Sequence, residues 1–180
     1  MNTSELYFEH HSFPPFSLHN CTQTLRYAHT IRAPKRTLNG NLVLIGTLIP
    51  HEKFSSTILG KYKQDPLLGQ LAPGDLLKVH CLHRLWQRLP SPASSDHPPT
   101  QLQSCALLRP PVPESIQITD GKDGIYFFEW KESKLWYDPH TPSPLFVSYR
   151  PILEMVLTAL KSTYAEVDLE TSWSFDLEET

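Results

Sequence analysis

Reactive residue types gather in one stretch of the sequence, APGDLLKVHCLHRLWQRLP, which runs from Ala72 to Pro90. It places Cys81 among histidines, basic side chains and a tryptophan. Three kinds of chemistry use such residues: a metal centre, a thiol nucleophile with a neighbouring base, and a surface that binds an acidic polymer. The alternative without chemistry is that the stretch forms one side of a hydrophobic core.

The spacing of the candidate metal ligands argues against a zinc site. Zinc takes about four converging ligands, usually announced by regularly spaced pairs of Cys or His. His80, Cys81 and His83 lack that spacing, and so do His19 and Cys21. On a strand, His80 and Cys81 would also point to opposite faces of the sheet. We therefore expect neither a metal nor another cofactor.

A catalytic cysteine would need an activating base and surroundings that stabilise the thiolate. Cys81 has basic neighbours, but the chain contains no phosphate-binding glycine loop, no nucleophile elbow and no zinc-protease motif. A small buried cysteine on an apolar face is the simpler interpretation of Cys81. We expect a protein that is not an enzyme, and a cysteine-dependent enzyme is kept as the third hypothesis.

Two periodicities compete within this stretch. As a helix, it would turn one apolar face, including Trp86, towards a core. As a strand, it would point Leu77 and Val79 inward and leave Trp86 exposed. The Pro-Gly-Asp turn before the run favours the strand. The outer face of that strand would carry Lys78, His80, Arg84, Trp86 and Arg88.

The composition indicates one domain of mainly β structure. The chain has 180 residues, of which 39% are hydrophobic and 19% charged, so it can bury a core. Its 17 prolines against 7 glycines favour strands and turns over a helical bundle.

The same sequence predicts an intracellular setting. No apolar run is long enough to cross a membrane, and the first residues lack the basic and apolar segments of a signal peptide. The three cysteines are not in the spacing of a disulfide framework, which favours reduced thiols. We expect a cytoplasmic protein, or a nuclear one in a eukaryote, with no membrane partner.

Charge is distributed unevenly along the chain. Between Asn20 and Pro113, eleven Lys and Arg stand against four Asp and Glu, a net charge of +7. A basic centre favours an acidic partner, above all nucleic acid. The segment 166–180 has six acidic residues and no basic one, and we expect a mobile tail there. Trp173 and Phe175 in this tail are candidate contacts to a protein partner.

Most of the remaining pattern predicts strands. Residues 24–33 alternate like a half-buried strand, and 42–49 resemble a well-buried one. The Asn39–Gly40 pair would join them into a hairpin with a basic tip. Further strands are expected within 101–108, 116–119 and 125–138, and an exposed proline loop at 90–100.

Two segments have helical spacing instead. Phe54, Ile58, Leu59 and Tyr62 predict a short helix that ends near Gly60. The run YRPILEMVLTALKSTYAE, 149–166, has a sustained helical period and predicts a helix near the C-terminus.

Two runs carry a resemblance to the OB-fold superfamily. The turn LAPGDLLKV and the upstream run LVLIGTLIP followed by a long connection resemble the strands and turns of many OB-fold domains. The resemblance covers roughly 22–138. It implies a small Greek-key barrel whose exposed strand face and loops bind single-stranded DNA, RNA or oligosaccharide. Its binding surface would include Tyr126, Phe128 or Trp130.

The sequence as a whole therefore predicts an OB-like barrel with one C-terminal α-helix and a flexible acidic tail. The expected parts are an extended arm at 1–21, a single β-rich domain at 22–165 and the tail at 166–180. The expected function is a non-enzymatic module that binds single-stranded DNA or RNA. The alternative is a protein-interaction or complex-assembly factor that uses the hydrophobic hairpin and the proline loop. The candidate nucleic-acid contacts are Lys35, Arg36, Lys78, His80, Arg84, Trp86, Arg88 and Trp130.

Overall fold

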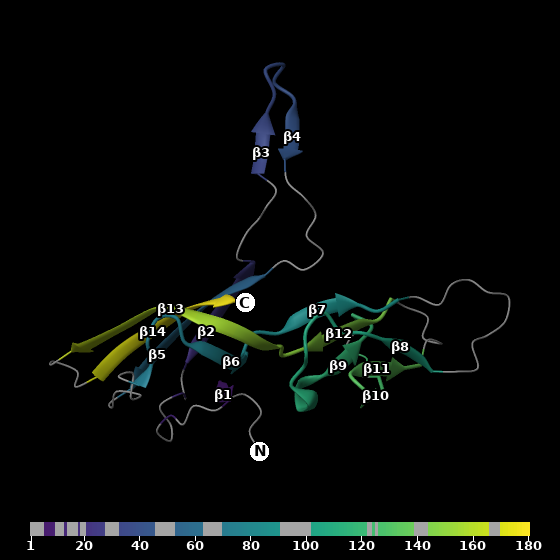
Figure 1. Ribbon diagram of the computed structural model, residues 1–180. Coiled ribbons are helices and arrows are strands. Elements are labelled where there is room, and N and C mark those ends of the chain that lie inside the picture. Colours follow the sequence, from purple (N-terminus) through teal and green to yellow (C-terminus); the bar gives the residue numbers. More distant parts are fainter. Residues whose placement is uncertain are drawn as a thin grey trace. The chain divides into compact units, whose positions relative to one another are not determined.

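A computed structural model describes most of the chain, and Figure 1 draws it as a ribbon. Two compact units divide the chain: the first consists of Met1–His10 and Lys78–Leu153, and the second of His11–Leu77 and Glu154–Thr180. The predicted boundaries between arm, domain and tail stay a prediction. The described residues are 6–9, 13, 18, 21–27, 33–45, 53–62, 70–90, 102–121, 124, 126–138, 144–165 and 170–180.

Strands account for nearly all the regular structure, so the predicted mainly β class is confirmed. A short 3₁₀ turn, η2 (Pro113–Ser115), interrupts them. No helix among the described residues has the length and apolar character of a membrane span. The strands are β1 (Tyr7–Glu9), β2 (Thr22–Tyr27), β3 (Ala33–Arg36), β4 (Leu42–Ile45), β5 (Phe54–Tyr62), β6 (Leu76–His80), β7 (Leu85–Arg88), β8 (Gln103–Cys105), β9 (Gln117–Thr119), β10 (Phe128–Lys131), β11 (Lys134–Tyr137), β12 (Phe146–Tyr149), β13 (Ile152–Ala165) and β14 (Glu170–Glu179).

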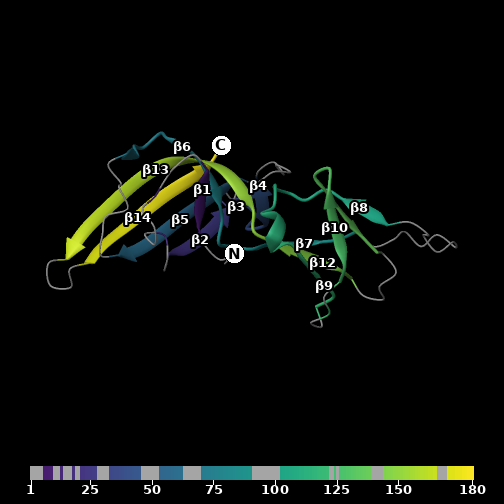
Figure 2. The same cartoon turned by 90° about the horizontal axis from the view of Figure 1, so that it is seen from below.

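Six strands form one sheet that is curled into a half-barrel (Figure 2). Their order across the sheet is β1-β6-β13-β14-β5-β2. The pairs β1–β6, β13–β14, β14–β5 and β5–β2 are antiparallel. The chain passes from one compact unit to the other within β6 and within β13.

Strand β14 lies inside this sheet, so the predicted flexible acidic tail is wrong for residues 170–180. Trp173, Phe175 and Leu177 alternate along β14 and are buried. Ser174 and Asp176, between them, lie on the opposite face. The segment therefore forms an ordinary half-buried strand that contains acidic residues and in which every second residue is apolar.

Strand β5 replaces the short helix predicted around Phe54 and Ile58. Phe54, Ser56, Ile58 and Gly60 alternate on its buried face. Because Ser56 and Gly60 are small and not apolar, the period of two residues is hidden in the hydrophobic pattern. The apolar residues that remain happen to match helical spacing.

Strand β13 replaces the predicted C-terminal helix. Leu153 and Leu157 are buried on one face of the strand. The pairing register with β14 then shifts by one residue, which leaves Thr158 as a β-bulge. Leu160, opposite Phe175, resumes the inward face after the bulge. Leu153, Met155 and Leu157 keep the strand period of two, and the inserted residue then gives an interval of three to Leu160. Ile152 and Val156, which are apolar residues of the other face, complete a pattern that imitates a helix.

The first unit contains a small sandwich of two three-stranded antiparallel sheets. One sheet has the order β7-β12-β9, and the other has the order β10-β11-β8. Side chains from both sheets meet in one core, as in other β-sandwiches. This core consists of Leu89, Ile116, Ile118, Leu135, Tyr137, Leu145, Val147 and Tyr149.

The Gln87 side chain pairs with the chain just beyond β8. Its Nε2 donates to the Ala106 carbonyl at 3.1 Å, and its Oε1 accepts from the Leu108 backbone N–H at 3.2 Å. One amide group thereby takes up the two hydrogen bonds that a neighbouring strand would offer.

A hairpin forms at the predicted Asn39–Gly40 turn, but with a different first strand. Strands β3 and β4 pair with each other, whereas β2 pairs with β5 in the curled sheet. Pro34, which has no N–H group, lies within β3. We call residues 33–45 the ribbon.

We predict that Gly60→Ala destabilises the protein by about 1 to 3 kcal/mol, the usual cost of overpacking a core. Gly60 lies directly opposite Trp173, and a Cβ atom at this position would overlap the indole ring. The measurement is urea unfolding followed by tryptophan fluorescence. Ser55→Ala, on the other face of β5, is the control and should change stability by less than about 0.5 kcal/mol. Equal stability of the two variants would contradict the packing of Trp173 over Gly60.

Candidate nucleic-acid interface

The stretch from Ala72 to Pro90 forms two strands separated by a bend. Strand β6 ends at His80, the bend spans 81–84, and β7 follows. Leu77, Val79 and Cys81 are buried, as the strand interpretation requires. The alternative of one amphipathic helix is therefore wrong, and Trp86 is exposed.

Strand β7 contributes Trp86 and Arg88 to the outer face of its sheet. The Trp86 side chain is 62% exposed and lies opposite Ser148 of β12. Arg88 is exposed and lies opposite Phe146, which is half-buried. Arg84 stands two residues before Trp86 and continues the same row along the chain. Arg84, Trp86 and Arg88 thus form a basic and aromatic row, which we call the Arg-Trp-Arg row.

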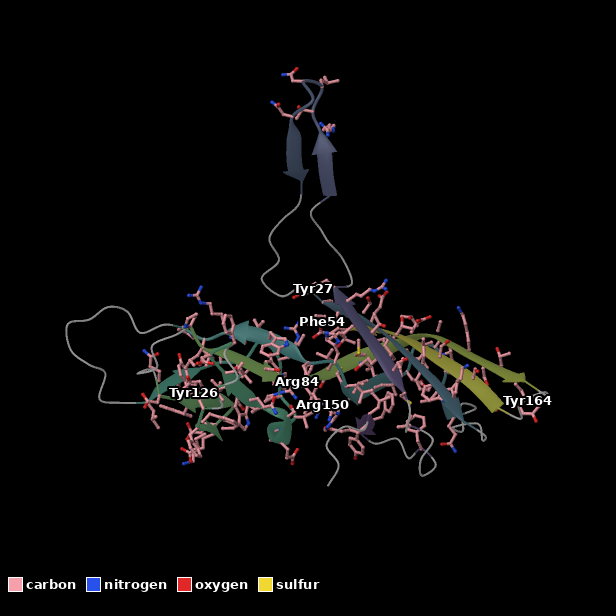
Figure 3. The ribbon with its side chains drawn as sticks, turned by 180° about the vertical axis from the view of Figure 1, so that it is seen from behind. Tyr27, Phe54, Arg84, Tyr126, Arg150 and Tyr164 are labelled. Atoms are coloured by element: carbon pink, nitrogen blue, oxygen red, sulfur yellow. The ribbon has the colours of Figure 1, made fainter. Side chains whose placement is uncertain are left out.

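Arg84, which is labelled in Figure 3, is held in place by hydrogen bonds to three segments. Its Nε donates to Ser148 Oγ at 2.7 Å, and its Nη2 donates to the Ser148 carbonyl at 3.0 Å. Nη2 also donates to the Ser115 carbonyl at 2.6 Å and to Gln117 Oε1 at 3.1 Å. All four acceptors are neutral, so these bonds orient the guanidinium without neutralising its charge.

A second arginine lies close to Arg84. Arg150 is buried, and its Nε donates to the Cys81 carbonyl at 2.7 Å. Its backbone N–H donates to Ser115 Oγ at 2.9 Å. Burial lowers the pKa of both arginines; for Arg150, Cys81 and the Glu114 carboxylate raise the pKa, whereas the charge of Arg84 lowers it. Arginine nevertheless stays protonated at neutral pH, so positive charge is concentrated at this end of the sheet.

Lys78 and His80 are bound by a carboxylate of the N-terminal strand. Glu9 of β1 receives Lys78 Nζ at 2.8 Å and His80 Nε2 at 3.0 Å. The ring of Tyr7 meets the His80 ring edge-on, with centroids 5.0 Å apart. The hydrogen bonds from Lys78 and His80 lower the pKa of the Glu9 carboxyl. These two predicted contacts therefore belong to a structural ion-pair cluster that fastens β1 to β6.

The other predicted contacts lie elsewhere. Trp130 is half-buried against the sandwich core. Arg36 is exposed on the ribbon, and Lys35 precedes it there, but the Lys35 side chain lies outside the described part of the structure. Trp173 and Phe175 are buried in β14, so no partner protein could reach them on the surface of this fold.

Two residues beside the Arg-Trp-Arg row escaped the sequence analysis. Phe146 and Gln117 come from β12 and β9, which follow β7 in the chain by many residues. The alternation in LFVSY, 145–149, is a signal that could have predicted Phe146 on an outer strand face. Its position opposite Arg88 depends on strand pairing, which the local pattern does not show. No known family model matches the chain, and no curated protein sequence is significantly similar to it. Function is therefore inferred from the chemistry of these residues.

The cysteines do not resemble activated nucleophiles. Cys81 is fully buried, and its Sγ faces the Val79 carbonyl at 3.9 Å. Burial raises the pKa of the Cys21 thiol to about 11 and also raises that of Cys105. Within the described ranges, no three His, Cys, Asp or Glu side chains form a group that could hold a metal ion.

We predict that the Glu9 cluster stabilises the protein in a pH-dependent way. Its carboxyl pKa lies below the ordinary value of 4.5. The contribution is therefore present above that value and is lost as the pH falls through the pKa of the folded state. The measurement is the urea midpoint as a function of pH for the natural chain and Glu9→Gln. Their difference should shrink on acidification. A difference that is independent of pH would contradict the role of the carboxylate.

We predict that Cys21 is alkylated slowly at neutral pH. Because its thiol pKa is about 11, the thiolate fraction should keep rising with pH well beyond the range of an ordinary cysteine. The measurement is the pH dependence of iodoacetamide labelling by peptide mass spectrometry. The same cysteine in urea-unfolded protein is the control. A labelling rate that levels off at the same pH in both states would show that burial does not control this thiol.

Proposed function

We propose that this protein is a non-enzymatic module that binds single-stranded DNA or RNA through the outer face of the β7-β12-β9 sheet. The observation that carries the proposal is the Arg-Trp-Arg row, in which an exposed Trp86 lies between two arginines on one strand face. Exposed aromatic rings stack bases, and neighbouring cations hold the phosphates.

The spacing of the row suits a repeating ligand. Alternate residues of a strand stand about 6.6 Å apart, so an extended chain could place a base on Trp86 and phosphates near Arg84 and Arg88. Phe146 adds a second aromatic surface opposite Arg88. Gln117, exposed and bonded to Arg84, offers an amide group to a base edge.

The ligand is proposed to be single-stranded because stacking needs an accessible base face. In a duplex the faces of the bases are covered by their neighbours, and only the groove edges are open. Trp86 is part of a strand, which cannot enter a base stack without disrupting it. Kinship with OB-fold proteins remains a separate proposal, and the binding described here does not require it.

The alternative, a protein-interaction or assembly factor, draws on the ribbon. All four residues of β4, Leu42–Ile45, are apolar. Among the described residues, β3 and β4 pair only with each other. An isolated two-stranded ribbon is only marginally stable in water, so a protein partner that packs on the ribbon would stabilise it. The proline loop of this alternative, 90–100, lies outside the described residues except for Pro90. Self-association or partner binding without any affinity for oligonucleotides would favour this alternative.

We predict that Trp86→Ala weakens the binding of single-stranded oligonucleotides by about 1 to 3 kcal/mol, because one stacked base is lost. The measurement is fluorescence anisotropy of a labelled oligonucleotide, with folding checked by circular dichroism. Trp136→Ala is the matched control, because Trp136 lies on the sheet β10-β11-β8 of the same sandwich and is only partly exposed. Equal losses for the two variants, or no binding by the natural chain at low salt, would contradict the proposal.

We also predict that Arg88→Gln reduces the salt dependence of that binding. Each phosphate contact that is lost should reduce the slope of log K against log salt by about 1. The measurement is a set of anisotropy titrations at several salt concentrations, with Lys134→Gln, at the exposed start of β11, as the control. If Arg88→Gln leaves the slope of log K against log salt unchanged, Arg88 does not contact a phosphate.

A further inference from the structure

The ribbon ends in a tip with a defined backbone. The Thr37 N–H donates to the Asn41 carbonyl, and the Gly40 N–H donates to the Thr37 carbonyl, each at 2.9 Å. Gly40 has a φ of +79°, which glycine adopts without strain. Arg36 Nη1 donates to the Gly40 carbonyl at 3.1 Å. The tip is therefore a closed loop with its arginine tied across it.

Every side chain from Arg36 to Asn41 is exposed, and that of Leu38 is fully exposed. The ribbon sequence from Ala33 to Ile45 has two basic residues, Lys35 and Arg36, and no acidic one. The tip thus presents an arginine, asparagine side chains and a single apolar group, without a carboxylate to repel a polyanion.

We propose that the tip of the ribbon enters the major groove of a base-paired segment of the nucleic acid. A two-stranded β-ribbon has the width that this groove admits. Asparagine can pair with the edge of adenine, a leucine can contact a thymine methyl group, and arginine can hold phosphate or guanine. The inference rests on the proposed function, which gives nucleic acid as the ligand, and extends that ligand to molecules that are partly double-stranded. Charge complementarity favours this ligand over a neutral or basic protein surface.

The test compares three DNA probes by fluorescence anisotropy: a short single strand, a blunt duplex, and the same duplex with a single-stranded tail. The main variant is Leu38→Asp, which places a carboxylate at the tip. Because Leu38 is fully exposed, the change should leave the fold intact. Leu102→Asp, at an exposed leucine of the other compact unit, is the matched control for the added charge. Arg36→Gln supplies an independent variant.

Leu38→Asp should weaken binding to the blunt and tailed duplexes by about tenfold, the size of one lost base contact, and should change binding to the single strand less than twofold. Arg36→Gln should reduce the salt slope for the duplex by about 1. Trp86→Ala should have the opposite effect and reduce the affinity for the single strand more than the affinity for the blunt duplex.

Three results would overturn the inference. If Leu38→Asp binds the duplex as tightly as the natural chain does, the tip does not contact the duplex. An equal loss on all three probes would mean that the tip does not distinguish paired from unpaired nucleic acid. Self-association that disappears in Leu38→Asp, with no loss of duplex binding, would assign the tip to a protein partner. Failure of the proposed function is separate, because then the natural chain would not bind the single strand.

Discussion

The guanidinium of Arg84 is the contact on which the proposed binding face depends. Its hydrogen bonds join the bend after β6 to β12, to the residue that closes the 3₁₀ turn and to the start of β9. They tie this bend to the sheet in which the pairing of β7 with β12 sets the face of Trp86, and the Cys81 N–H, which donates to the Pro151 carbonyl at 3.0 Å, supports the same bend. The charge stays available because the acceptors are carbonyl, hydroxyl and amide oxygens. One side chain therefore has a structural task and, under the proposed function, would also hold phosphate, a combination that is common for arginine.

The curled sheet of six strands shows a different solution, in which small residues make room for large ones. Gly60 accepts the Trp173 ring across the strand pair, and Ser56 occupies a buried position next in line. The outer face of the same strands carries hydroxyl groups, such as Thr57, which donates to Asp176 at 2.9 Å. Burial of aromatic rings on one face and short polar side chains on the other explain why a segment rich in acids can lie in the middle of a sheet.

The local pattern predicted strands where the buried residues are apolar and the register is unbroken, and it failed where small residues are buried or a bulge shifts the register. The turn at Gly40 follows from the Asn-Gly pair. The strand at Leu76–His80 and the exposure of Trp86 match the strand interpretation, which the preceding turn favoured over a helix. A bulge at Thr158 and the small residues of β5 produce helical spacing without a helix, because period counting assumes an unbroken register and bulky core residues. The site could be predicted in part: the Arg-Trp-Arg row lies within one short stretch, whereas Phe146, Gln117 and Glu9 reach their positions only through pairing between distant strands. Long-range pairing also brings the Glu9 carboxylate of β1 to Lys78 and His80, a contact that the local pattern does not reveal.

The amide of Gln87 has a consequence for how the sandwich behaves at high concentration. A sheet ends in a row of unpaired backbone groups, and such a row invites another molecule to add a strand. Beyond β8, the Ala106 carbonyl and the Leu108 N–H are already occupied by the Gln87 side chain. A foreign strand would have to displace an internal amide before it gained a single backbone bond. A residue of the opposite sheet thus makes these two backbone groups less accessible to an incoming strand.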